Sequence, residues 1–318
     1  MSDQNVPVTP PRRRGPLIAA IVAVVVVIVV AIVVVVNVAG GSGSSSTSSI
    51  ADGDKGSASN PVKIGVVGAS DPYWDEYTEA AAAAGISVEL VDFTDYAQPN
   101  PALSEGDLDL NQFQHIIYLA QYNTSADDDL VPIGSTAIYP LGLYSKEYTD
   151  VDDIPDGATV AIPNDSSNLA RGLLVLQAAG LVELQDGGSP FSTLDDVLDT
   201  SRVTVTTLDA NLTPTSLDDV AAAIINNDYV SDAGLTAADA IAQDDPSDPT
   251  ATPYINIFAA RSEDASDALY LQLVEIFQDT PAVTDGLIET SGDTAVLVKT
   301  SAADLQASLE EVEAEITG

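Results

Sequence analysis

Arg171 is a cation in a segment that is otherwise apolar. It lies in the first turns of a helix predicted over 168–179, directly after an apolar strand predicted over 159–163. A guanidinium there can form a bidentate pair with a carboxylate, and the helix N-terminus adds partial positive charge for the same anion. The alternative is a surface salt bridge to one of the many acidic residues of the chain. The position alone does not choose between these two roles.

The segment 113–118 brings together Phe113, His115 and Tyr118. Aromatic rings suit a flexible apolar or thioether side chain, because each sulfur–ring contact adds about 0.3–1.5 kcal/mol. The alternative is ordinary core packing around one histidine whose hydrogen bonds are satisfied. Both interpretations stay open on these residues alone.

Several kinds of chemistry have no candidate residues. The chain has no cysteine and one histidine, which excludes disulfides, thiolate nucleophiles and a histidine-based metal site. No phosphate-binding glycine loop or nucleophile elbow is present. Asp107, Asp109 and Asn111 have the spacing of a calcium loop, but Gln112 replaces its glycine and Tyr118 its last ligand. We therefore predict no metal, no cofactor and no enzymatic activity.

These residues need a scaffold, and the sequence alternates strand-like and helix-like segments. Strands are expected over 62–67, 87–93, 159–163, 202–208, 221–225 and 254–260, and helices over 77–84, 111–122, 168–179 and 265–278. This alternation indicates an α/β fold with a mainly parallel sheet. Ligands of such folds bind at the carboxyl ends of strands, where Tyr96, Asn111, Asn164 and Asn226 are expected.

The charge balance is strongly acidic, with 10 Lys and Arg against 49 Asp and Glu. Residues 62–318 hold 6 basic and 46 acidic side chains. Such a surface repels nucleic acid, so a nucleic-acid partner is excluded. The acidity by itself is explained by solubility, including solubility at high salt.

The N-terminal region predicts a membrane anchor. Residues 17–36 are twenty uncharged apolar residues, long enough to span a bilayer, and three arginines directly precede them. The positive-inside rule then gives a cytoplasmic tail over 1–16, a single transmembrane anchor over 17–39, a flexible Gly/Ser-rich linker over 40–61, and a folded part outside the cell membrane. A cleaved signal peptide is the alternative. Without cysteine the chain has no lipobox, so it cannot be a lipoprotein.

Beyond these patterns, the chain resembles the methionine-binding NlpA-type lipoproteins, the substrate-binding subunits of methionine ABC importers. The resemblance rests on residues 93–100, 106–115, 142–146, 160–171, 223–229 and 253–256. It implies a two-lobed periplasmic-binding-protein-like fold, type II-like, with lobe 1 over 62–140 and 255–318 and lobe 2 over 141–254. The ligand would be enclosed between the lobes.

The resemblance also implies roles for individual residues. Arg171 would bind the ligand carboxylate, and Asn226 and Asn256 would bond its amino and carboxylate groups. The side-chain pocket would consist of Tyr96, Phe113, His115 and Tyr118. Trp74 either edges this pocket or lies in a surface loop.

The implied function is delivery of a free amino acid, most simply methionine, to an ABC permease and its ATPase. The alternative is an anchored sensor or scaffold domain that binds a ligand but serves no transporter. The choice among L-methionine, D-methionine, the sulfoxide and a short peptide stays open.

Overall fold

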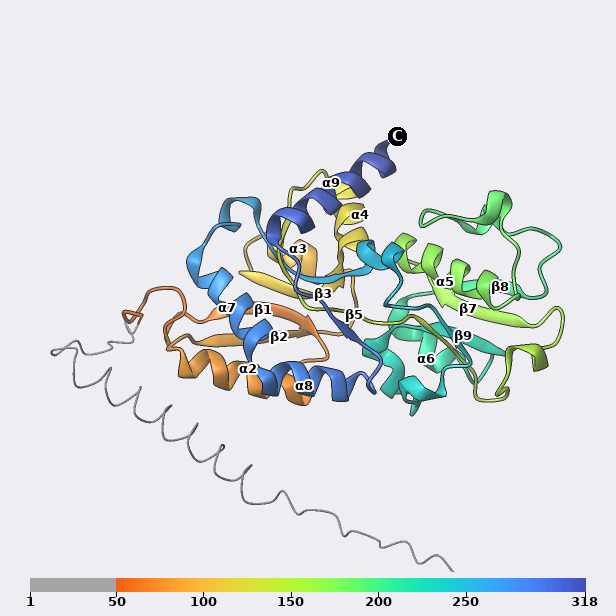
Figure 1. Cartoon of the computed structure of the whole chain (residues 1–318), viewed down its shortest axis with the longest axis horizontal. Helices are drawn as coiled ribbons and strands as arrows, with labels where there is room; N and C mark the ends of the chain where they lie inside the picture. The colour runs from red at the N-terminus through yellow and green to blue at the C-terminus, as the bar shows by residue number, and fades with distance from the viewer. Residues whose placement is uncertain (1–49) are drawn as a thin grey trace, which may run out of the picture. The chain divides into compact units, whose positions relative to one another are not determined.

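Two five-stranded mixed sheets organise residues 50–318, the part of the chain that the computed structural model describes (Figure 1). The predicted tail, the predicted anchor over 17–39 and the first residues of the predicted linker lie outside this part. Within residues 50–318, none of the helices combines the length and hydropathy needed to cross a membrane. Residues 51–57, from the end of the predicted linker, form turns, and Lys55 pairs with Asp109 at 3.0 Å.

The first sheet has the strand order β2-β1-β3-β11-β4. Its strands are β1 (Val62–Val67), β2 (Val88–Phe93), β3 (Leu110–His115), β4 (Val131–Ser135) and β11 (Asn256–Ala260). The pairings among β1, β2 and β3 are parallel, whereas β11 runs antiparallel to both β3 and β4. The strand β1 has the sequence Val-Lys-Ile-Gly-Val-Val, and all its residues except Lys63 are buried, as expected of a strand covered on both faces.

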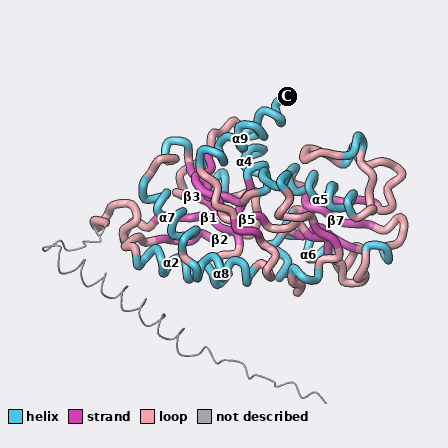
Figure 2. The backbone as a smooth tube through the Cα atoms, viewed as in Figure 1, coloured by secondary structure: helices cyan, strands magenta, loops and turns pink. Residues whose placement is uncertain are grey.

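Helices cover both faces of this sheet, as Figure 2 shows. One layer contains α2 (Pro72–Ala83), α7 (Ala268–Asp279) and α8 (Pro281–Thr290), whose apolar residues form one core with β1. The other layer contains α3 (Pro99–Ser104), α4 (Ile116–Ala126) and α9 (Ala302–Thr317). The C-terminal helix therefore packs on a sheet that begins at residue 62.

The second sheet has the order β10-β6-β9-β7-β8. Its strands are β6 (Gly142–Tyr144), β7 (Thr159–Pro163), β8 (Thr204–Leu208), β9 (Ala222–Ile225) and β10 (Ala242–Gln243). The pairs that β7 makes with β8 and β9 are parallel, and those of β6 are antiparallel. One face packs on α5 (Ser166–Ala178), and α6 (Thr213–Ser216) packs on β7 and β9.

The chain passes between the two sheets at residues 136–141 and again at 244–255. The first passage includes β5 (Ala137–Ile138), which pairs antiparallel with β12 (Val296–Leu297). The second includes a 3-10 helix, Pro249–Tyr254. The second passage leads directly into β11, whose first residue is the predicted ligand residue Asn256.

Four of the five strands in each sheet run in the same direction, so the prediction of mainly parallel sheet is confirmed, with β11 and β6 as the antiparallel strands. Two other expectations from the sequence are wrong. The predicted helix over 111–122 is the strand β3 followed by α4. Trp74 lies on α2, where it is 1% exposed and packs edge-on against Tyr77 with ring centroids 5.6 Å apart. It is a core residue, and it neither edges a pocket nor lies in a surface loop.

Candidate ligand-binding site

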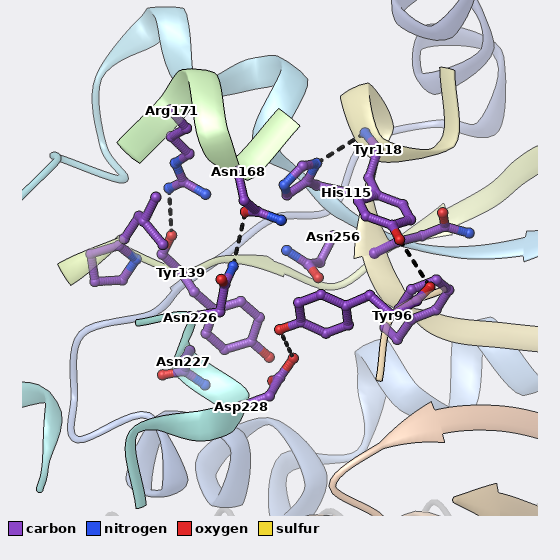
Figure 3. Close-up of a pocket in the computed structure, with 14 residues that line it drawn as sticks. Tyr96, His115, Tyr118, Tyr139, Asn168, Arg171, Asn226, Asn227, Asp228 and Asn256 are labelled. Atoms are coloured by element: carbon purple, nitrogen blue, oxygen red, sulfur yellow. Dashed lines mark hydrogen bonds between the residues drawn. The ribbon is translucent and has the colours of Figure 1, made fainter. Parts of the chain in front are cut away.

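A cavity lies among residues of the first sheet, the first passage, α4, α5 and the segments that follow β2 and β9 (Figure 3). It is lined by Tyr96, Phe113, Gln114, His115, Tyr118, Tyr139, Pro140, Leu141, Asn168, Arg171, Asn226, Asn227, Asp228 and Asn256. All seven residues that the sequence analysis assigned to a ligand are among them.

Arg171 is held in the cavity wall by three contacts. It is 5% exposed, its Nε donates to Oδ2 of Asp244 at 2.6 Å, and its Nη2 donates to the carbonyl oxygen of Tyr139 at 2.8 Å. Its Cζ lies 4.2 Å from the centroid of the Tyr254 ring, a cation–π contact. A guanidinium has five N–H donors, so three have no hydrogen-bond partner among residues 50–318. The group is fixed in position and still able to bind a carboxylate.

Hydrogen bonds orient two asparagines next to Arg171. Asp165 caps α5 by accepting the backbone N–H of Asn168 at 3.0 Å, and it also accepts Nδ2 of Asn168 at 2.9 Å. Oδ1 of Asn168 in turn accepts Nδ2 of Asn226 at 2.9 Å. This leaves Oδ1 of Asn226 buried and without a partner among the described residues. A buried acceptor without a hydrogen bond costs free energy, so this oxygen is available to accept a hydrogen bond from a ligand in the cavity.

Asn256 completes the polar part. It begins β11 and lies opposite His115 in the strand register, while its carbonyl oxygen accepts the backbone N–H of Thr136 at 2.8 Å. Its side chain lies in the middle of the cavity in Figure 3. The polar groups of the site therefore come from the segment directly after β9, from α5 and from β11.

Aromatic rings form the opposite wall. The ring of Tyr96 lies 5.9 Å from that of Phe113 and 6.1 Å from that of Tyr118. The hydroxyl of Tyr118 donates to the carbonyl oxygen of Tyr96 at 2.9 Å, which fixes both rings. Such a wall suits an apolar, polarizable side chain.

His115 caps α4 and stays uncharged. Its Nδ1 accepts the backbone N–H of Tyr118 at 3.2 Å. Burial and, to a smaller extent, the charge of Arg171 lower the pKa of His115 to about 3. The imidazole is therefore neutral at physiological pH and belongs to the uncharged wall.

Not every strand-end residue reaches the cavity. Asn111 lies within β3, where its Nδ2 donates to Oδ1 of Asn100 at 2.8 Å in a buried amide network with Gln114. Asn164 is exposed and donates to Asp209 at 2.6 Å. Their amides are used to hold loops and strands together.

Sequence reasoning missed three polar contributors. Asn168 and Asp228 lie inside strings that carry the family resemblance, and that proximity was the available signal. Tyr139 contributes its carbonyl to Arg171 from the passage between the sheets, and no sequence pattern marks it. Asp228 accepts a hydrogen bond from the hydroxyl of Tyr96 at 2.7 Å.

Comparison with known sequences gives a consistent result. Residues 62–298 match the profile of the NlpA lipoprotein family. The D-methionine-binding lipoprotein MetQ of Salmonella typhi is 42% identical over 215 residues, which are 66% of this chain and 78% of the relative. Outer membrane lipoprotein 2 of Mannheimia haemolytica is 37% identical over 231 residues, 71% of this chain and 82% of the relative. This chain differs from lipoproteins in having no cysteine.

Solved structures share the fold. Protein PG110 from Staphylococcus aureus has a TM-score of 0.75 at 35% identity, covering 79% of this chain and 99% of that one. A nutrient binding protein from Burkholderia cenocepacia bound to methionine has a TM-score of 0.69 at 34% identity, covering 74% and 99%. The α/β two-sheet architecture is that of substrate-binding proteins. The chain belongs to the NlpA lipoprotein family.

Proposed function

We propose that this protein is the extracytoplasmic substrate-binding subunit of an ABC importer, and that it binds methionine or a close relative. The observation that carries the proposal is the composition of one cavity. A buried guanidinium and fixed amides lie in it together with an aromatic wall.

Each part of a zwitterionic amino acid has a matching group. The free N–H donors of Arg171 suit the carboxylate. Oδ1 of Asn226 and the side chain of Asn256 suit the amino and carboxylate groups, and the rings of Tyr96 and Phe113 suit a thioether. The methionine-bound Burkholderia relative supports this match.

Binding would be coupled to closure of two lobes, 62–140 with 255–318 and 141–254. Three hydrogen bonds already link loops of the two sheets: Tyr96 to Asp228 at 2.7 Å, Asn211 to the carbonyl oxygen of Thr94 at 3.2 Å, and Tyr229 to the same oxygen at 3.4 Å. A ligand that contacts both sides adds to these bonds and stabilises the closed form. No covalent step is involved.

The closed form then docks on a permease, whose ATPase drives import. A transmembrane segment over 17–39 takes the place of a lipid anchor, with residues 1–16 in the cytoplasm. The flexible linker keeps the receptor close to the permease. The Streptococcus pneumoniae relative, which is 32% identical, is described as the substrate binding protein of a methionine transporter. This description supports the assignment.

Isothermal titration calorimetry of the full-length protein tests the binding function. We expect tight binding of methionine, weakened about 100-fold or more in Arg171→Ala because a buried charge partner is lost. The matched control is Lys146→Ala, which removes an exposed ion pair with Asp218 and leaves affinity unchanged. If neither methionine nor a close relative binds, the assignment is wrong.

Transport is tested separately in the source cells. Deleting the gene should abolish high-affinity methionine uptake, and the wild-type gene should restore it. Uptake that survives deletion while purified protein binds methionine would favour a sensor without a transporter.

A further inference from the structure

Asp228 is a carboxylate in the cavity wall without a cationic partner. It follows β9 by three residues, and its Oδ2 accepts the hydroxyl of Tyr96 at 2.7 Å (Figure 3). None of the ion pairs formed by residues 50–318 involves it. Burial, followed by the negative charge of Asp71, raises the pKa of Asp228 to about 7. The tyrosine hydroxyl provides one hydrogen bond and no charge.

The protein's own cations are committed elsewhere. Within residues 50–318, every lysine and arginine except Lys63 pairs with another acid: Lys55, Lys146, Arg171, Arg202, Arg261 and Lys299. Lys63 is exposed on β1. A charge that balances ionised Asp228 must then come from outside these residues, and the cavity is the route by which it reaches the carboxylate.

A second acceptor lies two residues away. Oδ1 of Asn226 is buried without a partner, and the hydrogen bond from its Nδ2 to Asn168 fixes which atom faces the space. Asn168 is itself oriented by its donation to Asp165. The relay makes Asn226 an acceptor in the wall of the cavity that Asp228 also lines. Two acceptors of this kind match a primary ammonium, which has three N–H donors and one positive charge.

We propose that Asp228 and Oδ1 of Asn226 form an ammonium subsite, which makes a free primary amine on the ligand a requirement for tight binding. The inference rests on the proposed function and adds to it a carboxylate that selects the amine. The site then binds the carboxylate of an amino acid through Arg171 and its ammonium group through Asp228. N-acylated and deaminated analogues are rejected because they leave the half-buried carboxylate of Asp228 without a cation.

A structural role for Asp228 is the competing explanation. The bond to Tyr96 joins loops of the two sheets, and a latch of this kind would affect all ligands equally. Asp228→Asn separates the two roles, because asparagine keeps the shape and an oxygen that can accept the tyrosine hydroxyl but removes the charge. Tyr96→Phe does the reverse, removing the bond and keeping the carboxylate.

The test is calorimetry of the full-length protein with methionine and with its deaminated analogue, 4-(methylthio)butanoate. In the wild type, loss of the amine should weaken binding at least about 30-fold. In Asp228→Asn, methionine should bind at least about 30-fold more weakly and the deaminated analogue equally well or better, so that the discrimination falls below about 3-fold. Tyr96→Phe should weaken both ligands and keep the discrimination. Asp232→Asn, an exposed acid in the same 3-10 segment, is the matched control and should match the wild type.

The subsite is overturned by an Asp228→Asn protein that discriminates between the two ligands as strongly as the wild type. Equal weakening of both ligands gives this result and is the pattern of a latch, and unchanged affinity for both gives it as well. If the proposed function is wrong, the wild type binds neither compound. That result also rejects the subsite, and it differs from the result above, in which the wild type binds methionine.

Discussion

Asp244 joins Arg171 to the first passage between the sheets. Its Oδ2 accepts Nε of Arg171 at 2.6 Å, and its Oδ1 accepts the backbone N–H of Leu141 at 2.7 Å. The carbonyl of Tyr139, two residues before Leu141, accepts from the same guanidinium. The group proposed to bind the ligand carboxylate is therefore hydrogen-bonded to the segment that would bend in the proposed closure of the two lobes. Binding of a carboxylate and the conformation of this passage are physically connected.

This connection predicts a cost for Asp244→Asn. Asparagine has one acceptor oxygen where aspartate has two, and it carries no charge, so it cannot replace both hydrogen bonds. We therefore expect the affinity for methionine to fall about 10-fold. Calorimetry measures the effect. Asp245→Asn, the neighbouring acid, which is bonded to Ser247, is the control. Unchanged affinity in Asp244→Asn would show that Arg171 does not need this support.

The aromatic wall predicts a preference for sulfur. Phe113 and Tyr118 have ring centroids 5.7 Å apart, with planes at 79°. Contacts between sulfur and these rings should favour methionine over norleucine by about 2- to 10-fold. Phe113→Leu keeps the wall apolar and should reduce that ratio toward one. Competition titrations give the ratio directly, and a ratio unaffected by the substitution would place the thioether elsewhere.

The raised pKa values of Asp228 and Asp71, about 7 and about 6 against 3.8 ordinarily, predict two opposite pH effects. Folding raises the pKa of both carboxyl groups, so their contribution to the stability of the ligand-free protein is fully present below pH 3.8. It is lost progressively as the pH rises from there through about 6 for Asp71 and about 7 for Asp228. Methionine affinity moves the other way, because ionised Asp228 is the form that pairs with an ammonium. The titratable groups around Asp228 are Asp71, Tyr73, Tyr96, Tyr139 and Tyr229.

Calorimetry from pH 5 to 8 in buffers of different ionisation enthalpy checks this prediction. Affinity should increase by up to about 10-fold per pH unit below pH 7, with protons released on binding. Asp228→Asn should flatten the profile. His115 should not contribute, because its pKa of about 3 lies below the range. Proton uptake on binding would contradict the account.

Trp74 predicts a stability effect without a binding effect. It is fully buried against Tyr77 and Phe277, and its indole N–H has no partner among the described residues. Trp74→Ala should cost about 3–5 kcal/mol of the free energy of unfolding. Trp74→Phe should cost much less, because no hydrogen bond is lost. Urea titration measures both, and equal costs would mean that the indole N–H is satisfied by water.

The seven residues predicted to bind a ligand came from the family resemblance, and the structure brings them to one cavity. The local pattern alone left two roles open for Arg171 and for segment 113–118. Arg171 is a cation in an apolar helix, and Phe113, His115 and Tyr118 are close together in the chain. The error at 111–122 has a physical origin. Successive polar residues in β3 resemble a helix start, yet Asn111 and Gln114 are buried and bond to Asn100 and to each other. Only tertiary contacts reveal that pairing.

Asp244 could not be selected from the sequence for the same reason, and the only signal for Asp228 was its place in the string 223–229 that carries the family resemblance. They are two acids among 49 Asp and Glu, and local pattern does not distinguish them. Their importance comes from Tyr96 and Arg171, which are more than seventy residues away in the chain. The roles of these two acids can be recognised only in the three-dimensional structure, which shows their contacts with Tyr96 and Arg171.

A crystal structure of the protein with methionine tests the central claim most directly. The account predicts methionine in the cavity, with its carboxylate within hydrogen-bond distance of the free N–H groups of Arg171 and its thioether against Tyr96 and Phe113. Methionine bound elsewhere, or bound with its carboxylate directed away from Arg171, would contradict it.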